Sequence, residues 1–251
     1  MGQGGAQSAQ DVADVVIRDD DLTTLGAGIA QGRATYANIR KAIHFLLATN
    51  LSEIAVIAAE TMSPGDQLES PMEMFWINLV TDVLPALGLA LEEPEQGIMS
   101  VPPRDPDAPM FTPDYYKMLA SEAGIISASA LAAHGYGLLR YGPGPRTRSL
   151  TFSTLVGAQL LHALSCRHDR FHGLTGGELF GNKYLNGTLA AAGALQVLPL
   201  AWPPLRRLLG LAPIGISDGL VIGGGMLASF AGNEYLLARR TMKDAASHPV
   251  S

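Results

Sequence analysis

Two apolar stretches of this sequence carry oxygen-bearing side chains whose spacing suits cation binding. Asn50 precedes Glu53 by three residues in the first stretch; in the second, Asn78 precedes Asp82 by four and Thr81 is adjacent to Asp82. Residues three or four apart lie on one face of a helix. Ionisable side chains inside a membrane span are costly and usually functional. The pattern predicts two neighbouring helices that present two carboxylates, two amides and one hydroxyl at one depth.

These side chains form an all-oxygen ligand set, without thiol or imidazole. Hard cations such as Ca²⁺ take about 6–8 oxygen ligands, whereas Zn²⁺ and Cu⁺ favour nitrogen and sulfur. Pro85 has no N–H and leaves the Thr81 carbonyl without its helical partner, which adds an oxygen. Gln159, in a later apolar stretch, is either a further neutral ligand or a helix–helix hydrogen-bonding group. We predict a site for a hard cation such as Ca²⁺; the alternative is that Glu53 and Asp82 are protonated and serve helix packing.

The elements that carry these residues are long apolar segments. A helix that crosses the hydrocarbon core of a bilayer needs about 20 predominantly apolar residues. Charged residues make up 16% of the chain, below the roughly 25% of soluble domains. The candidate segments are Ala42–Met62, Met72–Leu91, Met118–Leu139, Leu150–Cys166, Leu185–Trp202 and Ile216–Ala238. The expected fold is an all-α integral membrane protein with six transmembrane helices.

Lys and Arg in the loops predict the orientation of these spans. With a cytoplasmic N-terminus, twelve of the 17 Lys and Arg residues fall inside and five fall outside. The outside set is Arg140, Arg146, Arg148, Arg206 and Arg207. Both termini are therefore expected to be cytoplasmic, in a multi-pass protein of a bacterial-type plasma membrane. The net charge of −6 argues against nucleic acid as a partner, and the single cysteine, Cys166, excludes an internal disulfide and a multi-cysteine metal site.

The segment before the first span is predicted to be a short strand followed by a helix. Val12 to Ile17 is an apolar run that ends in polar residues, which favours a strand and a turn. Thr24 to Lys41 has a helical pattern, and no Pro separates it from the first span. This helix is expected to join a cytoplasmic element mechanically to the membrane. At the other end of the chain, residues 241–251 are expected to form a disordered tail.

Other polar or small residues in the spans are assigned structural roles. His162 is interpreted as a helix-packing residue, Asp218 as a helix cap, and Glu73 as part of a capping box with Ser70. Three side chains nearer the span ends are expected to reach the membrane interface: Glu122, His134 and Glu234. The small residues Gly219 and Gly223, four apart and followed by Gly224 and Gly225, favour close helix packing.

The sequence around the polar residues resembles a known family. Asn50-Leu51-Ser52-Glu53 and the run from Asn78 to Pro85 resemble the fifth and sixth membrane helices of P-type ATPases of the calcium-pump type. Before these helices, Asp11–Leu22 resembles the end of the family's phosphorylation domain, and Gly32–Ile39 resembles its stalk. After them, Ile98–Arg104 resembles the loop that follows the sixth helix. Phe152–Leu164 resembles the eighth helix, and Asn182–Arg240 resembles the ninth and tenth helices. The resemblance covers nearly the whole chain.

The resemblance implies a ligand set and a domain organisation. The positions that match the family's cation ligands are Asn50, Glu53, Asn78, Thr81 and Asp82. Gln159 stands where the resembled pattern has Glu in the eighth helix, which implies a weaker ligand there. Residues 1–33 are expected to be the end of a phosphorylation domain, a remnant of an α/β fold, with the stalk. Residues 34–240 are expected to form a six-helix transmembrane domain.

The function implied by the resemblance is that of the cation-binding transmembrane part of an ATP-driven P-type transporter, with Ca²⁺ as cargo. The 251 residues contain no Asp-Lys-Thr-Gly phosphorylation motif. ATP and Mg²⁺ are therefore expected only in the complete pump, and the partners are the lipid bilayer, the metal cation and a missing N-terminal half. The alternatives are a stand-alone six-helix membrane protein, acting as a passive cation pathway or a split-pump subunit, and a non-functional remnant.

Overall fold

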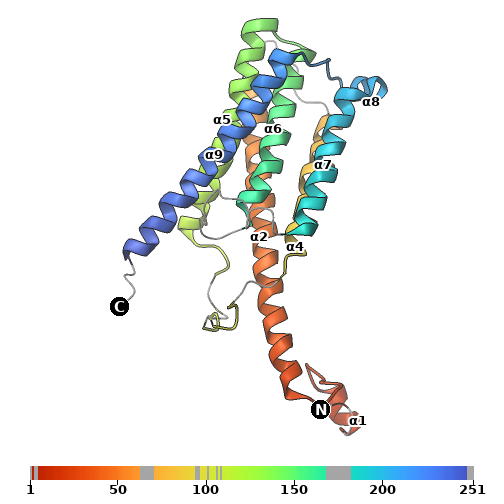
Figure 1. Cartoon of the computed structure of the whole chain (residues 1–251), viewed down its shortest axis with the longest axis vertical. Helices are drawn as coiled ribbons and strands as arrows, with labels where there is room; N and C mark the ends of the chain where they lie inside the picture. The colour runs from red at the N-terminus through yellow and green to blue at the C-terminus, as the bar shows by residue number, and fades with distance from the viewer. Residues whose placement is uncertain are drawn as a thin grey trace.

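The computed structural model describes residues 2, 5–62, 71–93, 97–100, 102–105, 107, 109–167 and 182–247. Every regular element in these residues is helical, so the all-α expectation is confirmed for them (Figure 1). The elements are α1 (Gln7–Asp11), α2 (Leu22–Thr61), α3 (Pro71–Ile77), the π-helix η1 (Asn78–Val83), α4 (Leu84–Ala90), α5 (Pro113–Tyr141), α6 (Pro145–Ser165), α7 (Lys183–Ala201), α8 (Pro203–Leu208) and α9 (Ile216–Ser247).

Among the described residues, two helical segments have the length and hydropathy to cross a membrane. They are Leu22–Thr61, which is α2, and Pro71–Ala90, which comprises α3, η1 and α4. These two segments contain the first two predicted spans and carry most of the candidate ligands. Helices α5, α6, α7 and α9 occupy the positions of the other four predicted segments.

Helix α2 is a single continuous element, as the sequence predicted. Asp21 caps its start, because Asp21 Oδ1 accepts a hydrogen bond from the Thr23 N–H at 2.9 Å. The same bond lowers the pKa of Asp21 below its ordinary value. The helix has 40 residues, which corresponds to about 60 Å at about 1.5 Å per residue. Its first half projects from the bundle (Figure 1), so one rigid helix joins the N-terminal segment to the candidate site.

The prediction of a strand from Val12 to Ile17 was wrong. This stretch follows the short helix α1 and has no regular structure. A 2.7 Å hydrogen bond from the Gly2 N–H to the Ile17 carbonyl joins its end to the start of the chain. A strand needs a neighbouring strand to pair its backbone groups, and the described part of the chain contains none. Val12 is 83% exposed.

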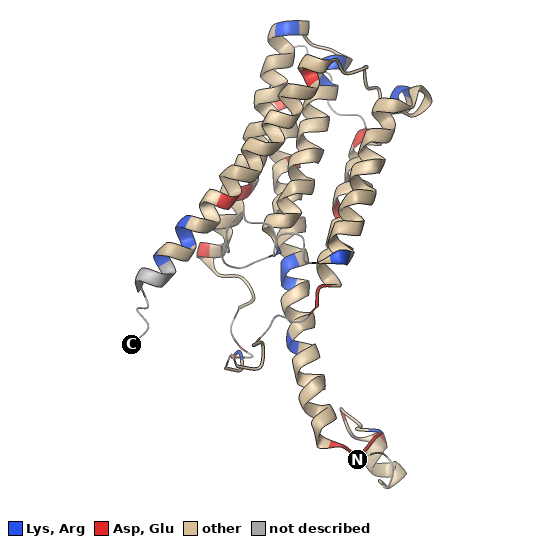
Figure 2. Cartoon of the chain, in the orientation of Figure 1, with Lys and Arg blue, Asp and Glu red and all other residues tan. Residues whose placement is uncertain are grey.

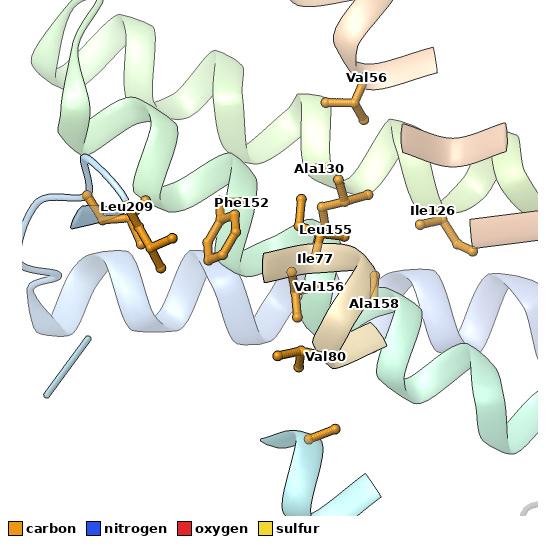
Figure 3. Close-up of a cluster of buried hydrophobic side chains, with 12 residues drawn as sticks. Val56, Ile77, Val80, Ile126, Ala130, Phe152, Leu155, Val156, Ala158 and Leu209 are labelled. Atoms are coloured by element: carbon orange, nitrogen blue, oxygen red, sulfur yellow. The ribbon is translucent and has the colours of Figure 1, made fainter. Parts of the chain in front are cut away.

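The remaining helices pack with α2 as a bundle in which α6 contacts α2, α4, α5, α7 and α9. Helix α5 packs on α2 and α6, α6 on α9, and α4 on α7 (Figure 1). Side chains from α2, η1, α5 and α6 meet in one buried apolar cluster, in which Figure 3 shows Val56, Val80, Ile126 and Leu155. This cluster holds the start of the second segment, Ile77 included, against α6.

Of the four glycines predicted to pack closely on the last helix, only Gly225 lies at a close approach within the described residues. Gly219 and Gly223 have open space where a Cβ would lie, so their assignment to close packing was wrong. On the same helix, a Cβ at Gly225 would lie 2.7 Å from Thr154 Cγ2 of α6. At the α4–α7 contact, a Cβ at Gly88 would lie 2.8 Å from the Leu185 Cα. At Gly88 the neighbouring backbone lies too close for a larger side chain, and at Gly225 a larger side chain would displace the Thr154 methyl group.

The three side chains expected at the membrane interface are instead buried. Glu122, His134 and Glu234 are at most 8% exposed. Two of them have polar neighbours on other helices: His44 Nε2 lies 2.7 Å from Glu122 Oε2, and His134 Nδ1 lies 2.9 Å from Thr151 Oγ1. The prediction failed because burial by neighbouring helices, rather than depth along the helix, determines exposure here.

Asp218 caps helix α9, which confirms that prediction. Its Oδ2 accepts a hydrogen bond from the Gly215 N–H at 2.9 Å. Glu73 does more than a cap would. It is fully buried, and its Oε1 lies 3.3 Å from Arg148 Nη2 on α6. The other half of the expected capping box, Ser70, lies outside the described residues.

Helix α9 continues into the segment expected to be a disordered tail. It ends at Ser247, so residues 241–247 are helical, and residues 248–251 lie outside the described residues. Thr241 Oγ1 donates to the Leu237 carbonyl at 3.1 Å, as helical side chains often do.

Candidate cation site

The Asp82 carboxylate lies between η1 and α2 and accepts hydrogen bonds from both. Thr49 Oγ1 donates to Asp82 Oδ1 at 3.2 Å, and Asn50 Nδ2 donates to Asp82 Oδ2 at 3.2 Å. Thr81 Oγ1 lies 3.5 Å from Asp82 Oδ1 and also donates to the Ile77 carbonyl at 2.8 Å. The predicted meeting of the two polar helices is therefore present, and Asp82 is its centre.

Glu53 lies one turn further along α2 and contacts α6. Gln159 Nε2 donates to Glu53 Oε1 at 2.9 Å and lies 3.3 Å from Ser52 Oγ. Gln159 is fully buried, and its Oε1 has no hydrogen-bond partner in the described part of the chain. A buried carbonyl oxygen without a donor is costly, and a cation would supply the missing positive charge.

Asn78 is more exposed than Thr81 and Asp82, the other two candidate ligands on η1. Asn78 lies on the exposed side of η1, whereas Thr81 is fully buried and Asp82 is half-buried. Residues 78–83 form a π-helix, which is wider than the α-helix assumed from the spacing. Pro85 follows directly at the start of α4, and its missing N–H disturbs the α-helical bonding just before it. Single turns of π-helix occur frequently at functional sites.

Sequence reasoning missed two hydroxyls in the site. Thr49 Oγ1 donates a hydrogen bond to Asp82. Ser52 Oγ accepts from the Gln159 amide, which also donates to Glu53. Both are buried on α2. The sequence could have indicated both hydroxyls, because each of these residues is adjacent in the chain to a candidate ligand. Hydroxyls in a helix usually bond a carbonyl of the preceding turn, which makes them easy to discount.

The arrangement is a set of oxygen groups supplied by α2, η1 and α6. Two carboxylates provide the negative charge, and neutral oxygens of Thr49, Thr81 and Gln159 lie around them. Asn50 is exposed at the rim. Its amide N–H now donates to Asp82. Rotation of the amide would turn the carbonyl oxygen toward the carboxylates instead, so that Asn50 could act as a ligand of a bound cation. Such a set fits a hard divalent cation.

Comparison with known proteins identifies the family to which this sequence is similar. A family model described as "Cation transporting ATPase, C-terminus" matches residues 70–236. The chain is 31% identical over 245 residues to a calcium-transporting ATPase of Bacillus subtilis, a match that covers 96% of this chain and 27% of that protein. It is 32% identical over 217 residues to a probable cation-transporting ATPase F of Mycobacterium tuberculosis, covering 86% of this chain and 24% of that protein.

A third relative is calcium-transporting ATPase 1 of Yarrowia lipolytica, which is 31% identical over 167 residues, 66% of this chain and 18% of that protein. The chain thus spans about a quarter or less of the length of these relatives. The family model covers well over half of the chain, and it includes η1, with Asp82, and α6, with Gln159. The chain therefore belongs to the family of cation-transporting ATPases and corresponds to its C-terminal region.

Proposed function

We propose that this chain is the cation-binding membrane part of an ATP-driven P-type transporter and that Ca²⁺ is its cargo. The observation that carries the proposal is that Thr49 of α2 connects the surroundings of the two carboxylates. Its Oγ1 donates to Asp82 on η1, and its carbonyl accepts from the buried Gln159 of α6, which also donates to Glu53. The proposed ligands are the six predicted from the sequence, Asn50, Glu53, Asn78, Thr81, Asp82 and Gln159, with Thr49 and Ser52 in support. Two relatives carry calcium transport in their names.

The proposed setting is a lipid bilayer crossed six times, by α2, by the α3–η1–α4 segment, and by α5, α6, α7 and α9. Large apolar side chains on these helices face outward, among them Ile54, Phe75, Val83, Val197 and Leu227, each more than half exposed. A lipid environment removes the cost of such exposure. Lys and Arg lie near the two ends of the bundle (Figure 2), where they would meet the headgroups. Both termini are placed in the cytoplasm.

This topology predicts the outcome of reporter fusions. A reporter inserted at Pro145, between α5 and α6, is expected to be active only outside the cytoplasm, because Lys and Arg are scarcer on that side. A reporter at the C-terminus is expected to be active only inside. An inside signal at Pro145 or an outside signal at the C-terminus would contradict six spans with cytoplasmic ends.

The segment before residue 34 is proposed to link the site to a catalytic domain. The projecting part of α2 is tied to the chain that follows α4. Asn38 Nδ2 donates to the Glu92 carbonyl at 2.6 Å, and Lys41 Nζ lies 3.4 Å from Glu92 Oε2. Arg33 Nη1 donates to the Ile98 carbonyl at 2.9 Å. A force applied to this part of α2 would therefore reach both helices that carry the carboxylates.

ATP hydrolysis is assigned to polypeptide outside these 251 residues. We expect the purified chain, incubated with labelled ATP, Mg²⁺ and Ca²⁺, to form no acid-stable phosphoenzyme, because it has no Asp-Lys-Thr-Gly motif. The same chain joined to a matching upstream half that contains the motif is the control and should be labelled. Labelling of the chain alone would show a catalytic site within it.

A further inference from the structure

A second group of metal-binding side chains lies in the bundle, away from the carboxylate site. One nitrogen each of His44 and His162 and the sulfur of Cys166 all lie within 4.8 Å of one another. His44 is on α2, and the other two lie on α6 or at its end. His162 and Cys166 are buried and His44 is largely so. His44 and Glu53 are nine residues apart on α2, which is about 13 Å along the helix, so the two groups are separate.

Glu122 of α5 completes a four-residue set. Its Oε2 lies 2.7 Å from His44 Nε2 and 3.9 Å from His162 Nε2. Cys166 Sγ lies 3.3 Å from His162 Nε2. The contact of Glu122 Oε2 with His44 Nε2 has the length of an ion pair. A metal ion bound by both atoms would take its place.

The outer ring nitrogens of both histidines have partners that would fix their orientation. His44 Nδ1 lies 2.9 Å from the Tyr115 hydroxyl, and His162 Nδ1 lies 3.3 Å from Asn233 Nδ2 of α9. Metal-bound histidines usually hydrogen-bond through the second nitrogen in this way. The Asn233 Oδ1 is buried and has no hydrogen-bond partner within the described residues. A half-turn of the Asn233 amide would let Oδ1 accept the His162 Nδ1–H, which leaves the Nε2 lone pair for a metal.

We propose that His44, Glu122, His162 and Cys166 form a tetrahedral site for Zn²⁺ that fastens α2 to α5 and α6. Two imidazoles, a thiolate and a carboxylate are all zinc ligands, and the soft thiolate disfavours Ca²⁺. Charge also balances, because the thiolate and the carboxylate together neutralise Zn²⁺ in a buried place where a net charge would be costly. Zinc–ligand bonds of about 2.0–2.3 Å put ligand atoms roughly 3.3–3.8 Å apart. The widest separations in the set, up to 4.8 Å, therefore have to shrink by about 1 Å, and the 2.7 Å separation of Glu122 Oε2 and His44 Nε2 has to grow by roughly 0.6 Å. The ion enters as Zn²⁺, and the thiol proton leaves to solvent.

The test is Co²⁺ binding by the full chain, purified in detergent after treatment with a chelator. Co²⁺ takes the place of Zn²⁺ and gives a thiolate-to-metal charge-transfer band together with intense visible bands when it is tetrahedral. We expect both features at one Co²⁺ per chain and their loss when Zn²⁺ is added. Cys166→Ser should abolish the charge-transfer band, and His44→Gln should weaken binding at least tenfold. Asn233→Ala should weaken it by about 10–100-fold, as loss of a histidine's hydrogen-bond partner usually does.

Two controls make the result decisive. Glu53→Gln and Asp82→Asn alter the carboxylate site and should leave the Co²⁺ spectrum unchanged, so the zinc site and the proposed calcium site can fail independently. Zn²⁺ should raise the melting temperature of the unaltered chain and not that of Cys166→Ser. Absence of a thiolate band in the unaltered chain would overturn the proposal. Equal Zn²⁺ stabilisation of Cys166→Ser, or loss of the spectrum in the two carboxylate variants, would overturn it as well.

Discussion

Glu53→Gln and Asp82→Asn are each expected to lower Ca²⁺ affinity more than a hundredfold in a pump rebuilt by joining this chain to a matching upstream half. Each change keeps the side-chain volume and removes one negative charge. Two unit charges about 4 Å apart interact by about 4 kcal/mol at an effective dielectric constant of about 20, and every 1.4 kcal/mol or so is tenfold in affinity. The measurement is Ca²⁺-dependent phosphorylation by ATP.

Two variants serve as controls for that result. Asp114→Asn makes the same chemical change at a position where the side chain is 84% exposed, and it should leave the Ca²⁺ dependence unchanged. Gln159→Ala should weaken binding less than either carboxylate change, because it removes a neutral dipole. Unaltered Ca²⁺ affinity in both carboxylate variants would mean that Glu53 and Asp82 serve helix packing. Equal loss in Gln159→Ala would make α6 a full contributor to the site.

Glu73→Gln is expected to destabilise the bundle by about 3 kcal/mol. Glu73 is fully buried and pairs with Arg148, which is also buried and donates to the Gly210 carbonyl at 3.2 Å. Removing one partner of a buried ion pair leaves an uncompensated charge, which costs about 3–5 kcal/mol. The pair joins α3 to α6, so its loss should loosen the start of the second segment. The measurement is reversible unfolding in mixed micelles.

The control for this prediction is an exposed ion pair on α5. Lys117 Nζ lies 2.8 Å from Asp114 Oδ1, and both side chains are at least 78% exposed. Exposed pairs contribute about 0–1 kcal/mol, so Asp114→Asn should change the unfolding free energy by much less than Glu73→Gln. The double variant Glu73→Gln with Arg148→Gln should recover part of the loss, because no buried charge remains. If Glu73→Gln and Asp114→Asn had equal effects, the buried pair would not stabilise the bundle.

Local spacing predicted much of the candidate site. Asn50 and Asp82 lie in consecutive antiparallel segments, and their side chains meet at 3.2 Å. The continuity of α2 followed from the absence of Pro between residues 22 and 61. These features depend on residues close in the chain, for which helical geometry is a sufficient guide.

Features that depend on tertiary packing were less accessible. The contact of Gln159 with Glu53 joins residues 106 apart in the sequence, and no local pattern assigns that pair. The π-helix at η1 changed which side of the segment Asn78 occupies, because its wider turn differs from the α-helix assumed. Glu122 was expected near the interface and is instead covered by neighbouring helices. Its histidine neighbours, which suggested the zinc site, lie on α2 and α6, remote from it in the sequence.

The most direct test of the calcium assignment is a structure of the rebuilt pump, determined by electron cryo-microscopy with Ca²⁺ and again with a chelator. We expect density for an ion about 2.3–2.6 Å from carboxylate oxygens of both Glu53 and Asp82, present only with Ca²⁺. We also expect Asn50 to turn its amide oxygen toward the ion, so that it no longer donates a hydrogen bond to Asp82. Ca²⁺ density elsewhere, with the Asn50–Asp82 and Gln159–Glu53 hydrogen bonds unchanged in both conditions, would contradict the calcium assignment.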